Sequence, residues 1–438
     1  MGSEKHPLGI IAVIIFIYRI LYLSENLNML TNEEKRVTIY NSKTKPTIPQ
    51  SVRPDTPLHR LNLNWREKDL PEKERTKHVH RLHPYLGKFI PQLVEIFLRK
   101  YFTAGQTILD PFVGSGTTLV QANEMGINAI GYDISKFNII LGRVKTARYD
   151  IRKVRMEVLD ILEKVRRQNP LRHSQLSLWE PRQDLFSFTQ SQPDNEYLQQ
   201  WFAPQALNQL LAYRDLIDRE GYEYRDLLQI ILCRSARSAR LTTHFDLDFP
   251  KRPQTTPYWC YKHARECYPT TEAYKFLERY SIDSLKRIQE FSKIRTNASV
   301  TIYHGDSRKA VIPQIDGVIT SPPYVGLIDY HEQHAYAYYL LGLDDKREQE
   351  IGPAVGGSSK IAQQKYQQDI AAVFIRAAEA MPRGSRMIVV AADKNDLYAK
   401  IAAMIKVEVE AVVLRHVNRR TGRRNSEFYE SVFIWRKC

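Results

Sequence analysis

Seven short apolar runs, separated by segments with helical periodicity, are the feature of this 438-residue sequence that most constrains its fold. Strands of a buried parallel sheet take the form of such runs, each bounded by polar or turn residues. The predicted strands are Thr107–Asp110, Ala129–Ile134, Ser299–His304, Gly317–Thr320, Arg386–Ala392, Val407–Arg415 and Ser431–Trp435.

Helical periodicity fills the gaps between these runs, over Ile90–Lys100, Thr117–Met125, Ala362–Ala380 and Asp396–Ile405. Alternating strands and helices predict an α/β fold, in which helices cover both faces of a mostly parallel sheet. A short polar turn joins the last two strands, so we expect these two to form an antiparallel hairpin at the sheet edge.

The charge of the chain indicates the kind of partner. Its 64 Lys and Arg against 49 Asp and Glu give a net charge of +15, which favours a polyanion, with nucleic acid first. The alternative is a soluble protein that is merely basic. Four cysteines in a chain of this length exclude a disulfide scaffold and indicate a reducing compartment.

Residues 139–297 interrupt the strand–helix rhythm, because they contain no convincing strand and much helical pattern. They also carry about half of the chain's positive surplus. We predict that they form a helical insertion in an α/β domain made of residues 72–138 and 298–438. The alternative is a set of extra helices that only pack on the sheet.

The N-terminal 71 residues are expected to be an extension followed by a polar arm. The apolar run Leu8–Leu23 contains Arg19 and is short for a membrane-spanning helix. Two interpretations remain: a weak membrane anchor, or a non-native extension upstream of a true start at Met29. We favour the extension and expect a cytoplasmic protein with no stable membrane partner.

The first motif with a chemical meaning is the segment LDPFVGSGTT at residues 109–118, directly after a strand and before a helix. Gly114 and Gly116 permit a close approach of the backbone to a ligand, and the helix N-terminus offers free N–H groups. Asp110 ends one strand and Asp133 ends the next, where an acidic residue suits a ribose diol. The spacing fits neither a dinucleotide fingerprint nor a phosphate-binding P-loop.

The second motif is TSPPY at residues 320–324, again at a strand end. Two prolines remove two N–H donors and stiffen the backbone, which leaves carbonyl acceptors beside the Ser321 hydroxyl and the Tyr324 ring. Such a group of atoms suits a planar base with an exocyclic amine. Taken alone, the segment is better explained as a Pro-rich turn, but its pairing with the first motif favours a base-binding role.

Together, DPFVGSGTT and TSPPY resemble the DNA amino-methyltransferases, which methylate N4 of cytosine or N6 of adenine. The resemblance covers about residues 82–438 without most of the insertion, and it implies a Rossmann-like sheet of seven strands that binds S-adenosylmethionine. It places Asp133 at the ribose, Ile134 against the adenine and Asp306 at the adenine amine. The other residues that it places around the cofactor are Phe89, Asp110, Phe112, Gly114, Ser115, Gly116 and Thr117.

The resemblance also implies a mechanism and a target. Ser321 is typical of the cytosine-N4 members, whereas adenine members usually carry Asp or Asn there. Ser321 and the Pro322 carbonyl, stiffened by Pro323, would accept the hydrogens of the amine, and Tyr324 would stack on the flipped base. Adenine-N6 methylation, methylation of an RNA guanine amine and a disabled nucleic-acid-binding fold stay open as alternatives.

The implied partner is a specific site in double-stranded DNA, with a cognate restriction endonuclease as a second candidate. Within the insertion, Arg234, Arg237 and Arg240 are candidates for gripping phosphates, and the alternative is a solvated or ion-paired helix face. Four more arginines lie on the turn between the last two strands, where they would repel one another without an anion: Arg419, Arg420, Arg423 and Arg424.

Cys260, His263 and Cys267 suggest zinc, but they lack a C-x-x-C pair and a clear fourth ligand, so we expect no metal site.

Overall fold

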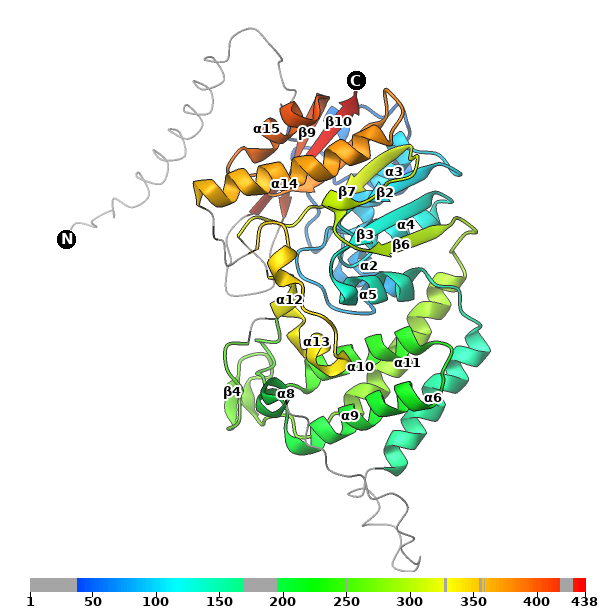
Figure 1. The fold of residues 1–438 in the computed structure, drawn as a ribbon, viewed down its shortest axis with the longest axis vertical. Helices are drawn as coiled ribbons and strands as arrows, with labels where there is room; N and C mark the ends of the chain where they lie inside the picture. The colour runs from blue at the N-terminus through cyan, green and yellow to red at the C-terminus, as the bar shows by residue number, and fades with distance from the viewer. Residues whose placement is uncertain are drawn as a thin grey trace, which may run out of the picture. The chain divides into compact units, whose positions relative to one another are not determined.

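The apolar runs form one sheet that carries the fold. The computed structural model describes residues 38–168, 195–248, 250–326, 329–353, 357, 359–417 and 428–438. Within these residues an eight-stranded sheet has the order β1-β9-β10-β8-β7-β2-β3-β6 (Figure 1). Its strands are β1 (Thr38–Ile39), β2 (Thr107–Asp110), β3 (Asn128–Asp133), β6 (Val300–His304), β7 (Gly317–Thr320), β8 (Arg386–Ala391), β9 (Val407–Val417) and β10 (Phe428–Lys437).

The strand directions confirm the predicted α/β fold of the Rossmann-like type. Strands β6, β3, β2, β7 and β8 pair in parallel, whereas β10 runs antiparallel to both β8 and β9. The antiparallel pairing of the last two strands is therefore confirmed. Strand β1 lies outside this hairpin and pairs in parallel with β9. It was not predicted, because two residues carry no readable periodicity.

Helices cover both faces of the sheet. On one face, the core contains side chains from α3 (Pro91–Tyr101), α4 (Thr117–Glu124) and α5 (Lys136–Thr146). On the other face, α14 (Lys360–Glu379) and α15 (Leu397–Ile405) pack over β7, β8 and β10. For the four helices that were predicted, the observed bounds lie within two residues of the predicted ones, because each helix follows an amphipathic run bounded by polar or turn residues.

The N-terminal arm is anchored to the sheet. Val52, Leu61 and Leu63 are buried in the same core as α3, and Asn64 Oδ1 accepts a hydrogen bond of 2.5 Å from the His416 backbone on β9. The arm contains the single turns η1 (Pro49–Ser51) and η2 (Leu58–Arg60), and the short turns α2 (Glu72–Arg75) and η3 (His78–Arg81) follow it before α3. The apolar run at residues 8–23 lies outside the described residues. Among the described helices, none is long and apolar enough to span a membrane.

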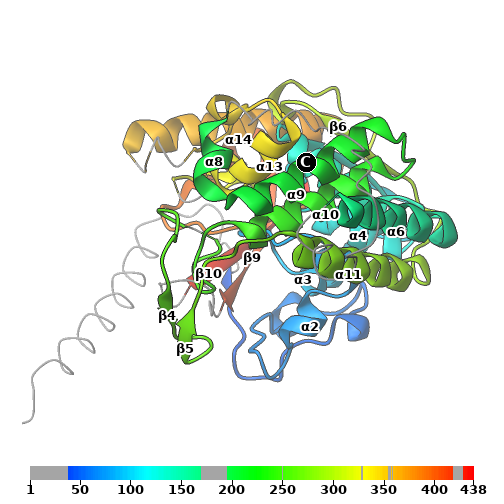
Figure 2. The same ribbon diagram turned by 90° about the horizontal axis from the view of Figure 1, so that it is seen from below.

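The insertion is mainly helical, and its helices share one hydrophobic core with α5 and with the segment after β7 (Figures 1 and 2). Its boundaries as a domain stay a prediction. The helices of this layer are α6 (Ile151–Arg167), α8 (Glu196–Trp201), α9 (Pro204–Arg219), α10 (Arg225–Ala239) and α11 (Tyr274–Ser292), with α12 (Tyr330–Gln333) and α13 (Ala335–Leu341) from the later segment. Two further turns are η4 (Ser307–Lys309) and η5 (Arg347–Gln349).

One expectation for the insertion is wrong: it does contain strands. A small antiparallel hairpin is formed by β4 (Tyr258–Cys260) and β5 (Arg265–Cys267). Each strand has three residues, which is too short for the alternation of polar and apolar residues that identifies a strand in a sequence.

A glycine in β3 allows the motif loop to pack against the sheet. An added Cβ at Gly131 would lie 2.3 Å from Val113 Cγ2 and 2.9 Å from Leu119 Cδ1. We predict that Gly131→Ala lowers the free energy of unfolding by about 1–3 kcal/mol, since overpacking displaces the loop. Urea unfolding measures this. Gly305→Ala is the control, because its Cβ meets nothing within 4 Å. Equal stability of the two variants would contradict the packing argument.

Candidate active site

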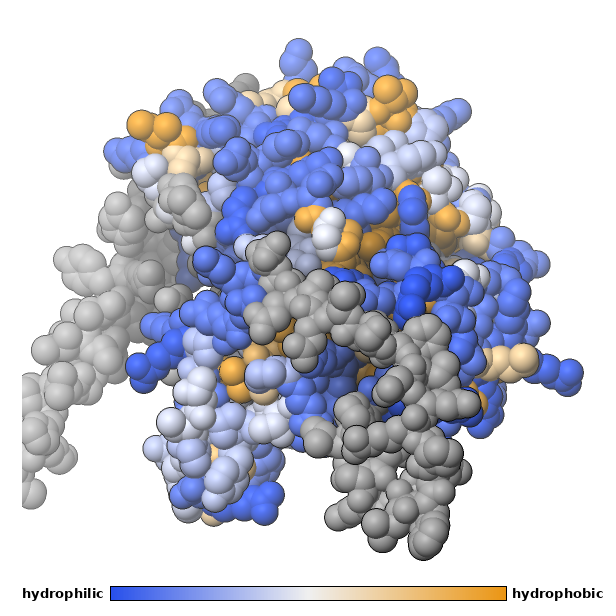
Figure 3. All heavy atoms as spheres, turned by 60° about the horizontal axis from the view of Figure 1, so that its bottom comes forward, coloured by the Kyte–Doolittle hydropathy of each residue, from blue (hydrophilic) through white to orange (hydrophobic). Residues whose placement is uncertain are grey.

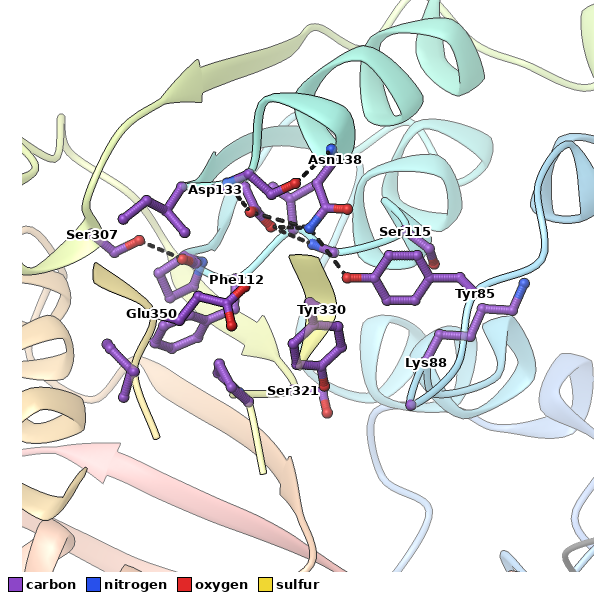
Figure 4. Close-up of a pocket in the computed structure, with 18 of the residues that line it drawn as sticks. Tyr85, Lys88, Phe112, Ser115, Asp133, Asn138, Ser307, Ser321, Tyr330 and Glu350 are labelled. Carbon is purple, nitrogen blue, oxygen red and sulfur yellow. Dashed lines mark hydrogen bonds between the residues drawn. The ribbon is translucent and has the colours of Figure 1, made fainter. Parts of the chain in front are cut away.

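A pocket lies at the carboxyl ends of the parallel strands, where the strand order reverses on either side of β2 (Figure 4). Open α/β sheets bind ligands at such a switch point. The space between its lining residues, open mouth included, is about 820 Å³. It is lined by Tyr85, Gly87, Lys88, Phe89, Pro111, Phe112, Val113, Gly114, Ser115, Thr117, Asp133, Ile134, Ser135, Asn138, Gly305, Asp306, Ser307, Ser321, Pro323, Tyr330, Gln349, Glu350 and Ile351.

The glycine loop between β2 and α4 forms one wall of the pocket. Gly114 and Gly116 have φ values of +47° and +76°, which side chains with a Cβ rarely adopt. The Gly116 backbone also approaches α5 closely, since an added Cβ would lie 3.3 Å from the Gly142 Cα. Beneath the loop, Nζ of the buried Lys145 donates a hydrogen bond of 2.6 Å to the Ser115 carbonyl. The loop is therefore held in one shape before a ligand arrives.

The carboxylate of Asp133, at the end of β3, connects three parts of the pocket. It accepts hydrogen bonds from the Gly114 and Ser135 backbone N–H groups at 2.8 Å, and from Asn138 Nδ2 at 3.2 Å. The same Asn138 amide donates to the Tyr85 hydroxyl at 3.1 Å. Burial raises the pKa of Asp133 to about 6, although these donors oppose the shift. At neutral pH, Asp133 presents a desolvated negative charge to the pocket.

A second carboxyl group, that of Asp110, lies behind the pocket wall at the end of β2. It is 1% exposed, and its Oδ1 accepts hydrogen bonds from Thr320 Oγ1 at 2.6 Å and from the Phe112 backbone at 3.1 Å. Its Oδ2 has no partner in the described part of the chain. Burial raises the pKa of Asp110 to about 7. The Thr320 contact joins the two sequence motifs, because Thr320 directly precedes Ser321.

The pocket also has an aromatic wall that sequence reasoning did not identify. Tyr85 stacks on Tyr330 with ring centroids 5.9 Å apart and on His334 at 5.2 Å, and Tyr330 lies between Tyr85 and Ser321 in Figure 4. Glu350 faces the same space and contacts the buried His331 imidazole. Tyr85 lies in a segment that the family resemblance covers. No sequence motif around Tyr330 or Glu350 identifies them as pocket residues, because only the fold brings them to the pocket.

The residues predicted around a cofactor are largely brought together. Asp110 and Gly116 lie behind the pocket wall. The other eight line the pocket: Phe89, Phe112, Gly114, Ser115, Thr117, Asp133, Ile134 and Asp306. The Asp306 carboxylate is already paired with the Arg308 guanidinium, at distances of 2.9 to 3.1 Å. The structure thus brings eight of these ten residues to one pocket, and their role in binding a cofactor stays a prediction.

Only two of the four residues predicted to act on a base line the pocket. Ser321 and Pro323 line the pocket, and the Pro323 carbonyl accepts a hydrogen bond of 2.8 Å from the Tyr366 hydroxyl. Tyr324 is buried in the core beside α14, and its hydroxyl donates to Glu430 Oε1 at 2.9 Å. Neither Pro322 nor Tyr324 is among the pocket-lining residues. In this conformation the Tyr324 ring is not presented to the pocket.

The three insertion arginines predicted to grip phosphates face inward. Arg234 pairs with Asp283 at 2.6 Å and lies over the Tyr280 ring, Arg237 pairs with Asp248, and the buried Arg240 donates to the Leu247 carbonyl at 2.7 Å. Arg234 and Arg237 lie on α10 and Arg240 directly follows it, and this helix packs between α9, α11 and α13, so it has no broad open face. For Arg234 and Arg237, these contacts match the alternative of an ion-paired helix face better than a phosphate-binding one. Arg419, Arg420, Arg423 and Arg424 lie outside the described residues.

Comparisons with known proteins place the chain among methyltransferases. Residues 20–141 match the sequence model of a family described as DNA methylase. The Type II methyltransferase M.MjaII of Methanocaldococcus jannaschii is 40% identical over 430 residues, covering 83% of this chain and 81% of the relative. M.BsoBI of Geobacillus stearothermophilus, also a Type II methyltransferase, is 27% identical over 67% of this chain and 60% of its own length.

Among solved structures, the rRNA methyltransferase aviRa from Streptomyces viridochromogenes is 12% identical, with a TM-score of 0.31 over 81% of this chain and 88% of that one. The extent of the match to M.MjaII establishes the family. The chain belongs to the DNA methylase family, the DNA amino-methyltransferases.

The buried Asp110 carboxyl predicts an unusual pH dependence of stability. Its folded pKa of about 7 lies above the unfolded value of about 3.9, so its ionisation favours unfolding progressively from about pH 4 to pH 7. Asp110→Asn keeps an oxygen for the Thr320 and Phe112 donors and removes the charge. We predict that it raises stability at pH 8, on the order of 2–4 kcal/mol, with little effect at pH 4.

Thermal unfolding of both proteins from pH 4 to pH 8 measures this difference. Asp344→Asn, at an exposed position, is the control and should show no such trend. A variant that is less stable than the parent at pH 8 would mean that the hydrogen bonds outweigh the desolvation of Asp110.

Proposed function

We propose that the protein transfers a methyl group from S-adenosylmethionine to the exocyclic N4 amine of cytosine in a specific double-stranded DNA site. The observation that carries this proposal is the position of Ser321. Ser321 follows β7, the strand next to β2, and its side chain lines the same pocket as the glycine loop and Asp133. A cofactor at the glycine loop and a base at Ser321 would therefore meet in one pocket.

The pocket suits S-adenosylmethionine in its charge and its hydrogen-bonding groups. Asn138 Oδ1 is a buried acceptor without a partner in the described part of the chain, and buried polar atoms are normally satisfied. Asp133 and Glu350 add carboxylate acceptors, while Phe112 and Ile134 offer apolar surface for a purine ring. When bound, S-adenosylmethionine supplies a methyl group made electrophilic by the adjacent sulfonium.

The residues of the chain would act mainly by positioning the base. A target base has to leave the stack to enter the pocket, as for other enzymes that act on a base. The Ser321 hydroxyl would accept a hydrogen bond from the exocyclic amine and orient its lone pair. Tyr330, whose ring lines the pocket, is better placed than Tyr324 to stack on the base. Tyr324 would instead position the Pro-Pro segment through Glu430.

The assignment of cytosine rests on the serine at position 321. A hydroxyl is a single short acceptor, whereas Asp or Asn, typical of adenine members, reaches farther into the pocket. Double-stranded DNA as the partner is supported by the net charge of +15 and by the Type II methyltransferase relatives. Their designation also supports a cognate restriction endonuclease as a second partner.

Nucleoside mass spectrometry tests the proposed reaction directly. Unmethylated double-stranded DNA is incubated with the full-length protein and S-adenosylmethionine, digested and analysed. We expect N4-methylcytosine. N6-methyladenine would keep the pocket and the cofactor but overturn the role assigned to Ser321. Absence of any methylated nucleoside, from a folded protein that binds the cofactor, would overturn the DNA substrate and direct the search to RNA.

Removing the Ser321 hydroxyl should affect turnover and not cofactor binding. We predict that Ser321→Ala lowers kcat by about 10- to 1000-fold, because an interaction that aligns the amine is lost. The dissociation constant for S-adenosylmethionine, measured by calorimetry, should change less than about twofold. Ser292→Ala, at an exposed position of α11, is the matched control. Unchanged turnover in Ser321→Ala would exclude the proposed role.

A further inference from the structure

Four side chains that can bind a metal converge beside the β4–β5 hairpin of the insertion: His244, Cys260, His263 and Cys267. Each offers one ligand atom, and these atoms all lie within 4.8 Å of one another. Cys260 Sγ lies 3.6 Å from Nδ1 of both His244 and His263, and Cys267 Sγ lies 3.5 Å from His263 Nδ1.

These separations match a shared zinc ion. A tetrahedral zinc has Zn–S bonds of about 2.3 Å and Zn–N bonds of about 2.0–2.1 Å, so its sulfur and nitrogen ligands lie about 3.6 Å apart. Thiol and imidazole groups are only weak hydrogen-bond partners for each other, and such bonds alone do not require four of them to converge. We propose that these four residues bind one structural zinc ion.

The fold explains why the sequence did not reveal this site. Cys260 ends β4, Cys267 ends β5, and His263 lies in the tight turn between them, where its N–H donates to the Cys260 carbonyl. The missing fourth ligand comes from the loop after α10. There, the His244 N–H donates a hydrogen bond of 3.0 Å to the Tyr258 hydroxyl on β4. The sequence predicts no metal site because it shows neither a C-x-x-C pair nor this fourth ligand.

The hairpin needs such a centre, because it has little core of its own. Two strands of three residues are not stable alone in water. Its large side chains point outward, since Trp259 is 55% exposed and Tyr261 80%, whereas Cys260 and Cys267 are buried. The turn also contains Ala264 at a φ of +49°, a conformation that costs free energy for a residue with a Cβ. A metal would replace the missing hydrophobic core.

Other arrangements of the two cysteines fit less well. The hairpin register pairs Cys260 with Arg265 and Cys267 with Tyr258, so the cysteines are not cross-strand partners. Both are free thiols in the structure. Two thiolates and two imidazoles are the ligands of structural zinc, and four protein ligands close the coordination sphere. The site would therefore support the fold and would not catalyse a reaction.

The centre would hold an exposed surface in place. The hairpin projects from the helical layer in Figures 1 and 2, and Figure 3 shows its lobe at the lower left in pale colours, unlike the bluer surface around it. Trp259, Tyr261, Lys262 and Arg265 are exposed on this lobe. Without a metal these side chains would lose a fixed orientation. This inference does not depend on the proposed methylation reaction.

Metal analysis of the purified full-length protein tests the site. Inductively coupled plasma mass spectrometry should find about one zinc per chain after expression with zinc. Cys260→Ser and Cys267→Ser should each reduce this to under about 0.1. Cys438→Ser is the matched control, because Cys438 is a free, exposed cysteine outside the cluster, and it should keep the zinc.

Two further measurements guard against loss of zinc through misfolding alone. Cobalt(II) loaded into the parent protein should give the intense visible absorption of a tetrahedral thiolate site. His244→Cys should retain one metal and shift this absorption, because a third sulfur replaces a nitrogen. A parent protein that binds neither zinc nor cobalt while folded, or one with a Cys260–Cys267 disulfide, would overturn the proposal.

Discussion

The site depends on one buried negative charge, the carboxylate of Asp133. Burying an ionised group is costly unless hydrogen-bond donors replace the lost water. Here the donors are the Gly114 N–H in the glycine loop after β2, the Ser135 N–H directly before α5, and the Asn138 side-chain amide in α5. Because these donors belong to two segments, the glycine loop and the start of α5, satisfying the carboxylate also sets the position of these two segments relative to one another. The pocket exists in the folded chain as a result of this requirement.

Much of the fold was predictable, because buried strands of four or more residues and amphipathic helices produce recognisable patterns in the local sequence. Strands β2 and β7 have the predicted bounds, since each apolar run ends at a polar motif. Strands β1, β4 and β5 have two or three residues and left no pattern. The site followed the same rule. The loop at Gly114–Gly116 and Ser321 were found from contiguous motifs, whereas Tyr330 and Glu350 enter the pocket only through tertiary folding.

The arginines at the C-terminal end of α10 and directly after it show why positive charge in a sequence does not by itself identify a binding surface. A basic residue on a helix indicates a polyanion only if its face is open, and that depends on what packs beside it. Within the chain, Arg234 pairs with Asp283 and Arg237 pairs with Asp248. Arg240 donates a hydrogen bond to the Leu247 carbonyl. His244 shows the converse case. It carried no signal, because its partners Cys260 and His263 reach it only through the hairpin.

The pairing of β3 with β6 has a consequence for the order of folding. These neighbouring strands are separated by the whole insertion, as the contact between Asn128 and Ser299, 171 residues apart, illustrates. Contacts within helices form in microseconds, whereas pairing across a long chain segment is slow. The helical layer should therefore acquire structure before this edge of the sheet closes. During synthesis, the β3 edge would stay open until the ribosome has produced the insertion, and in that interval the chain would be most prone to pair with another copy.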